Sequence, residues 1–353
     1  MKRLDFIWTS FKDFACVKPV YDYFISIGWE CDLVKIHKHK FRNSKKIKNL
    51  AQHVVAAYDI PIRRLEKNNW SGKIIYIDHG VGPIKYYAYR YKYFHDCALL
   101  FYQGEVFKRK MEAVNPGFKN GLMGGFVKMD ELISLKVDRL TFCQKYNLDP
   151  AKPIILFAPT WGGKDSKHWG IRNAKFMKGV QNLVIAPHSS DYKYAKRFNA
   201  IVPEIKSNIN EIIKVADLIV SDVSSIIGEA AAINKPVVQL ILSSYPGCFP
   251  NYDKRKEGSW VHSDIINYEE RNTDRSIRPF KIAYLDEDWV VGHTTKPENI
   301  LDTIADAVQN PDKYLKERKY WGDQCCWKAD GKTIPRIAEM IKIYIDTGKR
   351  VQI

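Results

Sequence analysis

Short apolar runs, each closed by a polar turn and followed by a segment with helical spacing, recur along this chain. The clearest example begins at residue 218. The run from Leu218 to Val220 is bounded by polar residues, which is typical of a strand buried on both faces of a sheet. Apolar residues then recur at helical spacing from 226 to 233, and the stretch from Asn234 to Pro236 ends that helix. A second apolar run, at 237–240, completes a strand–helix–strand unit.

The same alternation lies on both sides of a break at 147–150, where Asn-Leu-Asp-Pro interrupts a helical pattern. It predicts an α/β fold with two doubly wound parallel-sheet domains. We place the domains at residues 1–147 and 148–353, and we expect the last helix to pack back on the first domain. Further strands are predicted at 4–8, 31–36, 73–77, 99–101, 154–157 and 183–186. Helices are predicted at 14–27, 131–146, 209–215, 297–308, 311–318 and 334–345.

Several of these strands end in residues suited to chemistry. In doubly wound folds, ligands bind beyond the carboxyl ends of the strands. The strand ends in question are Asp78-His79-Gly80, Ala158-Pro159-Thr160-Trp161, Pro187-His188 and Asp222-Val223-Ser224-Ser225. Ser224 and Ser225 stand at the start of a predicted helix, where free N–H groups favour an anion such as phosphate. The simpler alternative is that Asp222 and Ser224 only cap that helix.

Charge narrows the choice of partner. The chain has 353 residues and a formal net charge of +16, from 56 Lys and Arg against 40 Asp and Glu. Such a surplus favours a polyanionic partner: nucleic acid, an anionic membrane or a phosphorylated substrate. A basic run at 35–49 is either an ordinary solvated face or a contact with anionic lipid.

Cysteine usage and hydropathy indicate the compartment. The seven cysteines follow no spacing of a metal site or a disulfide framework, which favours a reducing cytoplasm. No apolar run approaches the roughly 18 residues that a spanning helix needs. We therefore expect a cytoplasmic protein, either free or peripheral at the inner face of the cell membrane. We assign no function to the irregular segment at 243–286 from the sequence.

In this order, the motifs resemble those of the CDP-glycerol glycerophosphotransferase family, the teichoic-acid primases and polymerases. The similar segments are His79-Gly80-Val81-Gly82-Pro83-Ile84-Lys85, Ala158-Pro159-Thr160-Trp161, Pro187-His188, Asp222-Val223-Ser224-Ser225 with Glu229, and Asp330-Gly331-Lys332. The first is one residue longer than in the family, Gly162 replaces the family's arginine, and Val223 replaces its tyrosine. The resemblance implies a GT-B-type fold, in which two Rossmann-like domains face a cleft, with an acceptor-side first domain and a nucleotide-donor second domain.

The resemblance also implies an activity: transfer of glycerol phosphate, or a related polyol phosphate, from a CDP-activated donor to a hydroxyl of a glycan or lipid-linked acceptor. His79 is then the candidate general base, with Asp78 as a residue that orients it, and His188 stabilises developing charge. Candidate donor ligands are Thr160, Asp222, Ser224, Ser225 and Glu229. For Glu229, contact with the ribose hydroxyls and an ordinary solvated charge are equally good interpretations. Trp161 is expected to pack rather than to stack on a nucleobase. No metal and no cofactor are expected.

Two alternatives stay open at this stage. A GT-B glycosyltransferase with a nucleotide-sugar donor would use the same fold and the same phosphate site. A basic nucleic-acid-binding protein, from a different class, is allowed by the charge and the 13% aromatic content. No nucleic-acid motif is present and the basic residues are spread along the chain, so no nucleic acid is expected as a partner.

Overall fold

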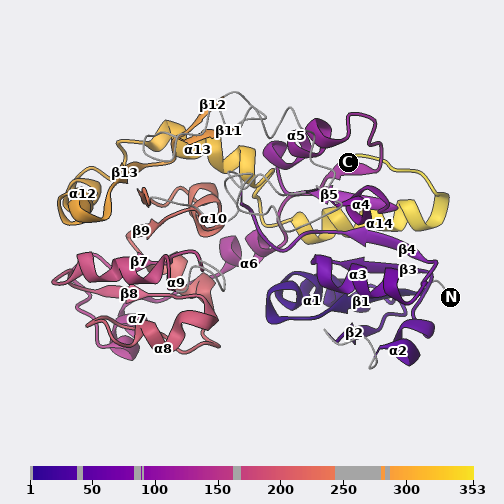
Figure 1. Ribbon diagram of the computed structural model, residues 1–353, viewed down its shortest axis with the longest axis horizontal. Helices are drawn as coiled ribbons and strands as arrows, with labels where there is room; N and C mark the ends of the chain where they lie inside the picture. Colours follow the sequence, from indigo (N-terminus) through magenta and orange to yellow (C-terminus); the bar gives the residue numbers. More distant parts are fainter. Residues whose placement is uncertain are drawn as a thin grey trace.

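The apolar runs form two parallel β-sheets, one in each half of the chain (Figure 1). The computed structural model describes residues 3–37, 43–82, 89, 91–161, 168–242, 280–282 and 287–353. Within these residues the first sheet has six strands, in the order β2-β1-β3-β4-β5-β6. They are β1 (Leu4–Trp8), β2 (Leu33–Lys35), β3 (His53–Ala56), β4 (Lys73–Tyr76), β5 (Leu99–Tyr102) and β6 (Gly121–Met123), and each pairs in parallel with its neighbours.

The second sheet has the order β13-β10-β9-β7-β8 and is also parallel. Its strands are β7 (Ile155–Phe157), β8 (Leu183–Ile185), β9 (Leu218–Ser221), β10 (Val237–Leu240) and β13 (His293–Thr295). A separate antiparallel pair joins β11 (Phe280–Ile282) to β12 (Glu287–Trp289). The central strand β9 is buried along its whole length, as its uninterrupted apolar run predicted. The two-sheet α/β fold predicted from the sequence is confirmed.

Helices and 3₁₀ turns connect the strands. In the first half they are α1 (Phe11–Ser26), α2 (Ser44–Lys48), α3 (Asp59–Lys67), α4 (Lys92–His95) and α5 (Glu105–Val114). In the second half they are α7 (Arg139–Tyr146), η2 (Ile171–Met177), η3 (Ser189–Asp191), α8 (Tyr192–Ala195), α9 (Ile209–Val215), α10 (Ile226–Ala232), η5 (Pro297–Asn299), α12 (Ile300–Gln309) and α13 (Leu315–Cys325). The last helix, α14 (Thr333–Thr347), lies against α1 beside the first sheet (Figure 1).

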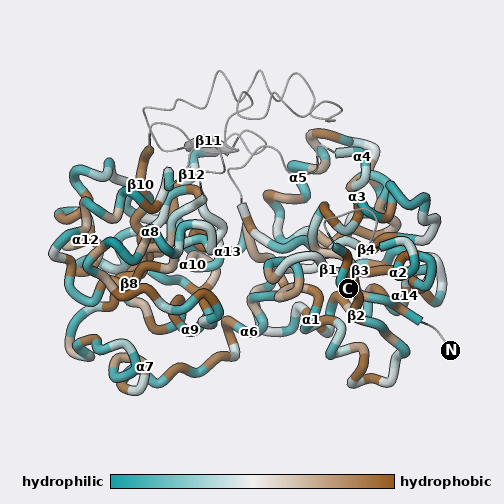
Figure 2. The backbone as a smooth tube through the Cα atoms, turned by 60° about the horizontal axis from the view of Figure 1, so that its bottom comes forward, coloured by the Kyte–Doolittle hydropathy of each residue, from teal (hydrophilic) through white to brown (hydrophobic). Residues whose placement is uncertain are grey.

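Helix α6 (Lys128–Ser134) lies between the two halves, as Figures 1 and 2 both show. Asp130 and Glu131, adjacent residues of α6, each accept hydrogen bonds from the start of another helix. Asp130 accepts hydrogen bonds from the backbone N–H groups of Thr333 and Ile334, at the start of α14. Glu131 accepts hydrogen bonds from the side chains of Asn208 and Asn210, at the start of α9. One short helix therefore binds both α14, which packs beside the first sheet, and α9, which precedes β9 of the second sheet.

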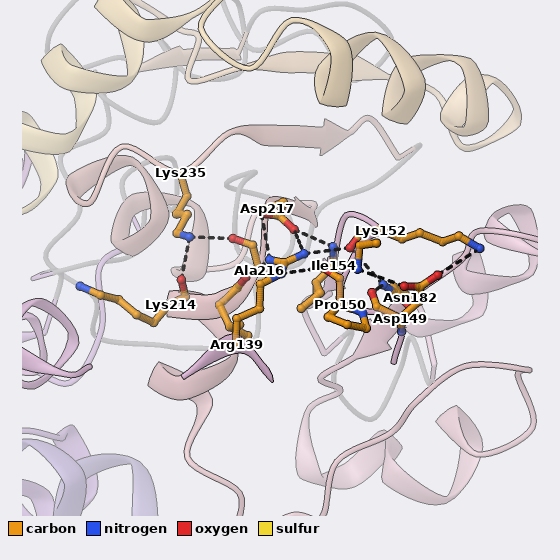
Figure 3. A network of polar contacts seen from close by, with 12 residues as sticks. Arg139, Asp149, Pro150, Lys152, Ile154, Asn182, Lys214, Ala216, Asp217 and Lys235 are labelled. Carbon is orange, nitrogen blue, oxygen red and sulfur yellow. Dashed lines mark hydrogen bonds and ion pairs between the residues drawn. The ribbon is translucent and has the colours of Figure 1, made fainter. Parts of the chain in front are cut away.

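The start of α7 is fastened to the amino edge of the second sheet (Figure 3). Arg139 forms an ion pair with Asp217 at 2.9 Å. The Nζ of Lys235 donates to the carbonyl oxygens of Lys214 and Ala216, both at 2.7 Å, which satisfies carbonyls at the end of α9. This network lies at the opposite end of the strands from the candidate site residues, so we read it as structural.

Some predicted elements were wrong. The single helix predicted at 131–146 is two helices, α6 and α7, separated by residues 135–138. Asp138 begins α7 by accepting a hydrogen bond from the N–H of Thr141, and this N-cap signal was overlooked in the sequence. The helix predicted at 311–318 begins only at Leu315 and runs to Cys325. Strands β3, β6 and β13 were not predicted.

Candidate active site

The candidate base, His79, lies just beyond the carboxyl end of β4. Its Nδ1 is 3.0 Å from the carbonyl oxygen of Ala57, which follows the neighbouring strand β3. The same nitrogen is 3.2 Å from the carboxylate of Asp78, and the ring meets Tyr58 edge-on with centroids 4.5 Å apart. The imidazole is therefore held from three sides, while 29% of the side chain stays exposed.

Asp78 reaches His79 because the alternation of the strand has stopped there. Neighbours along a regular strand point to opposite faces of the sheet. Asp78 instead has φ 50°, and its carboxylate also accepts the N–H of His79 at 2.6 Å. Burial acts to raise the pKa of Asp78, but hydrogen bonds from His79 and Gln103 outweigh it and lower that pKa. An ionised Asp78 keeps the proton of neutral His79 on Nδ1, so Nε2 carries the lone pair that a base needs.

The buried carboxylate of Asp222 stabilises the turn that follows β9. The residue is completely buried. Its carboxylate accepts the N–H of Thr160 at 3.0 Å and the N–H of Val223 at 2.6 Å. Ser221 adds a bond from its hydroxyl to the carbonyl oxygen of Ala158 at 2.6 Å. Asp222 therefore ties the end of β9 to the end of β7 and fixes the loop that carries Thr160, a positioning role rather than an open ligand site.

Two predicted site segments meet across the two halves of the molecule. A methyl group placed on Gly80 would lie 3.9 Å from the Cβ and Oγ of Ser225. One placed on Gly228, in α10, would lie 3.1 Å from a methyl carbon of Val81. The loop that follows His79 thus rests on the first turns of α10. Ser225 precedes α10, but its hydroxyl makes no capping hydrogen bond.

The other predicted donor ligands differ in burial. The Thr160 Oγ1 is buried without a hydrogen-bond partner among the residues described, which leaves it available to a ligand. Glu229 is only 6% exposed, so the interpretation as an ordinary solvated helix charge was wrong. Ser224 is half-buried in the same turn as Asp222.

His188 lies beyond the end of β8 and stacks on Trp161. The two rings are 5.0 Å apart and inclined by 8°. Nδ1 of His188 accepts the N–H of Ser190 at 3.2 Å, so this side chain caps the turn that follows β8. Burial, and then the charge of Lys12, lower the pKa of His188 to about 4. At neutral pH the ring is therefore uncharged, with its proton on Nε2 as a donor.

Lys128, the first residue of α6, was missed in the sequence analysis. Burial acts to lower the pKa of this lysine, but its surroundings, which include Glu229 and Asp78, outweigh burial and raise it. Lys128 thus lies near a carboxylate from each half of the molecule. No motif pointed to it, because its neighbours are distant in sequence.

The described residues offer neither a metal site nor a membrane-spanning helix. Among the residues described, no group of three or more His, Cys, Asp and Glu side chains is placed to hold a metal ion. In that same part of the chain, no helix combines the length and the apolar character needed to cross a membrane. Residues 83–85 and 162–163 of the predicted motifs lie outside the described residues, as do residues 38–42 of the basic run and most of the segment 243–286.

Comparison with solved structures defines the fold class. The wall teichoic acid polymerase TagF aligns with a TM-score of 0.63 and 16% sequence identity, over 98% of this chain and 90% of that chain. TagF soaked with CDPG gives a TM-score of 0.63 and 16% identity, over 98% and 89%. The S. aureus MnaA-UDP co-structure gives a TM-score of 0.64 and 13% identity, over 100% and 99%. The chain has the GT-B-type fold predicted from its sequence.

Part of the chain also matches a known protein family in sequence. Residues 103–242 match the model of the family described as CDP-Glycerol:Poly(glycerophosphate) glycerophosphotransferase. That segment includes Thr160, His188 and the turn from Asp222 to Glu229, whereas His79 precedes it. A search of curated protein sequences finds no match. The resemblance to the CDP-glycerol glycerophosphotransferases is confirmed over residues 103–242.

Proposed function

We propose that this protein transfers glycerol phosphate, or a related polyol phosphate, from a CDP-activated donor to a hydroxyl of a glycan or lipid-linked acceptor. The observation that carries the proposal is the close approach of the loop after His79 to Ser225, since a methyl group on Gly80 would lie 3.9 Å from the Ser225 hydroxyl. This approach places the loop that follows the candidate base beside the turn that carries Ser224 and Ser225. A phosphoryl transfer needs such a pair: a base for the attacking hydroxyl and donors for the phosphate oxygens.

In the proposed reaction the acceptor oxygen attacks the phosphorus that carries the polyol. Nε2 of His79 takes the proton of the acceptor hydroxyl as the new P–O bond forms. The bond between that phosphorus and the oxygen of CMP breaks, and CMP leaves with the electron pair. Asp78 stabilises the imidazolium that results.

The residues after β7, β8 and β9 bind the donor in this scheme. The hydroxyls of Ser224 and Ser225, with the unpartnered Oγ1 of Thr160, donate to the diphosphate oxygens. His188 is neutral and donates from Nε2 to the charge that develops on CMP. Glu229 is buried one helical turn beyond Ser225, at the phosphate end of the proposed site. Asp222 positions the Thr160 loop.

A nucleotide-sugar donor is the second candidate, because the S. aureus MnaA-UDP co-structure aligns as well as TagF does. A donor panel read by thermal shift separates the two. A ligand present at 100 times its Kd stabilises the folded state by about 2.7 kcal/mol. We expect CDP-glycerol or CDP-ribitol to raise the melting temperature more than UDP- or CMP-sugars do. A larger shift with a nucleotide-sugar would favour the glycosyltransferase.

We further propose that the acceptor is reached from a membrane surface on the cytoplasmic side. Helix α2 presents Lys45, Lys46 and Lys48 to solvent, and only Ile47 of that helix is buried. Clustered lysines are attracted to anionic lipid by about 1 kcal/mol each. Attachment of this kind is peripheral and reversible.

A further inference from the structure

A histidine outside the predicted site is held in place by a buried carboxylate. Nδ1 of His168 lies 2.7 Å from Oδ1 of Asp191, and Asp191 is only 2% exposed. The imidazole lies flat on the ring of Tyr194, with centroids 4.0 Å apart and an angle of 13°. Nε2 makes no hydrogen bond to any residue described and is not buried, and 23% of the side chain is exposed. The ring is thus oriented by two contacts and presents one free nitrogen.

The pair lies at the same edge of the second sheet as the proposed donor site. Asp191 donates its N–H to the carbonyl oxygen of His188, in the turn beyond β8. The segment that carries His168 presses against the end of β7: a methyl group on Gly170 would lie 2.3 Å from the carbonyl oxygen of Thr160. The sheet order β9-β7-β8 therefore places three consecutive strand ends in a row. Adjacent strands are about 4.8 Å apart, so this row spans about 10 Å, comparable with a nucleoside diphosphate.

The direction of the donor along this row follows from the first half of the molecule. Ser225, at the β9 end, would lie 3.9 Å from a methyl group on Gly80, the residue that follows the candidate base. The reacting phosphorus belongs at that end. The nucleoside must then extend away from β9, past β7 and toward β8, where Asp191 holds His168. This step rests on the function proposed above.

We propose that His168 binds the nucleobase of the donor and selects cytosine over uracil, with Asp191 as its positioning residue. Because the carboxylate of Asp191 accepts the proton on Nδ1, Nε2 is the ring nitrogen that offers a lone pair to a ligand. Cytosine offers an exocyclic amino group, a hydrogen-bond donor, at the position where uracil has an oxygen acceptor. A lone pair on Nε2 therefore attracts the first base and repels the second.

The test is a titration of CDP, UDP and inorganic pyrophosphate into the full chain by calorimetry. We compare the wild type with His168→Ala and with His168→Gln, whose amide can restore a hydrogen bond. His53→Ala, a half-buried histidine on β3, is the matched control. In His168→Ala we expect the Kd for CDP to rise roughly tenfold, the loss of one hydrogen bond. The Kd for pyrophosphate should stay unchanged and the Kd for UDP should fall, because the repulsion of uracil is removed; His168→Gln should recover part of the CDP affinity.

Two results would overturn the inference. One is an unchanged Kd for CDP in His168→Ala. The other is an equal loss of CDP, UDP and pyrophosphate, which would mean that the pair of His168 and Asp191 only braces the loop. If the wild type binds CDP but His168→Ala does not differ from it, this inference fails alone. If the wild type binds none of the cytidine ligands, the proposed function fails as well.

Discussion

Gly80 and Ser225 come from different halves of the chain, yet a methyl group on Gly80 would lie only 3.9 Å from the Ser225 hydroxyl. This contact joins the carboxyl end of β4 in one sheet to that of β9 in the other. His79, which precedes Gly80, has Nδ1 held by Ala57 and Asp78, and no described residue hydrogen-bonds its Nε2.

Replacing His79 by Ala should abolish turnover and leave donor binding nearly intact. The loss of a general base costs on the order of 10²–10⁴ in rate. CMP release measures the rate, and titration with CDP-glycerol measures binding. His53→Ala, on the neighbouring strand, is the control and should turn over normally. Wild-type turnover in folded His79→Ala would remove His79 from the reaction.

Replacing Ser224 and Ser225 together by Ala should weaken CDP-glycerol more than cytidine. The two hydroxyls donate to phosphate oxygens in the proposed scheme, and neutral hydrogen bonds contribute about 1 kcal/mol each. Both Kd values can be measured by calorimetry, with Ser26→Ala at the exposed end of α1 as the control. Equal weakening of both ligands would show that these serines serve the fold and not the diphosphate.

Stability should respond to pH through His188. Its pKa is lowered to about 4, first by burial and then by Lys12. Between the ordinary pKa of about 6.5 and that value, the unfolded chain takes up a proton that the folded chain does not. The free energy of unfolding should therefore fall as the pH decreases from about 6.5 toward 4. Urea unfolding of the wild type and of His188→Gln at several pH values measures this. If both proteins lose stability equally over that range, the titration belongs to other groups.

The membrane proposal predicts salt-sensitive binding through α2. Replacing Lys45, Lys46 and Lys48 by Gln should reduce sedimentation with anionic liposomes, because screening and charge removal act on the same attraction. Donor binding should not change. A control variant should carry the same three-charge change on another exposed surface: Lys178, Lys316 and Lys319. If the α2 variant sediments as the wild type does, α2 is an ordinary solvated surface.

Local patterns in the sequence were enough to predict part of this fold. The unit from β9 to β10 was predicted because its apolar run, its helical spacing and its closing turn are all contiguous. Strand β3 was not predicted: His53–Ala56 is short, and its place is set by pairing with β1 and β4 on either side. Such pairing depends on the whole sheet, which no local pattern encodes.

The candidate site, too, was predictable where local patterns decide it and not where long-range contacts do. Strand ends located His79, His188 and the turn at Asp222, since ligands bind beyond the carboxyl ends of parallel strands. Their environments depend on distant residues: the carbonyl of Ala57 against His79, and Lys12 near His188. These are long-range contacts. The sequence was therefore enough to select the candidate residues. Their protonation states and the positioning role of Asp222 could be inferred only from the three-dimensional structure.

The most direct test of the proposed function is the fate of CDP-glycerol when the protein is given glycerol phosphate oligomers, whose terminal hydroxyl is a simple acceptor. Attack on the phosphorus that carries glycerol must release CMP and lengthen the acceptor by one glycerol phosphate for each CMP formed. Chromatography of the nucleotides and mass spectrometry of the oligomers measure both products. We predict that CMP and lengthened acceptor appear in equal amounts with the wild type and are absent with His79→Ala. No product from CDP-glycerol, together with release of UDP from a UDP-sugar, would contradict the proposal.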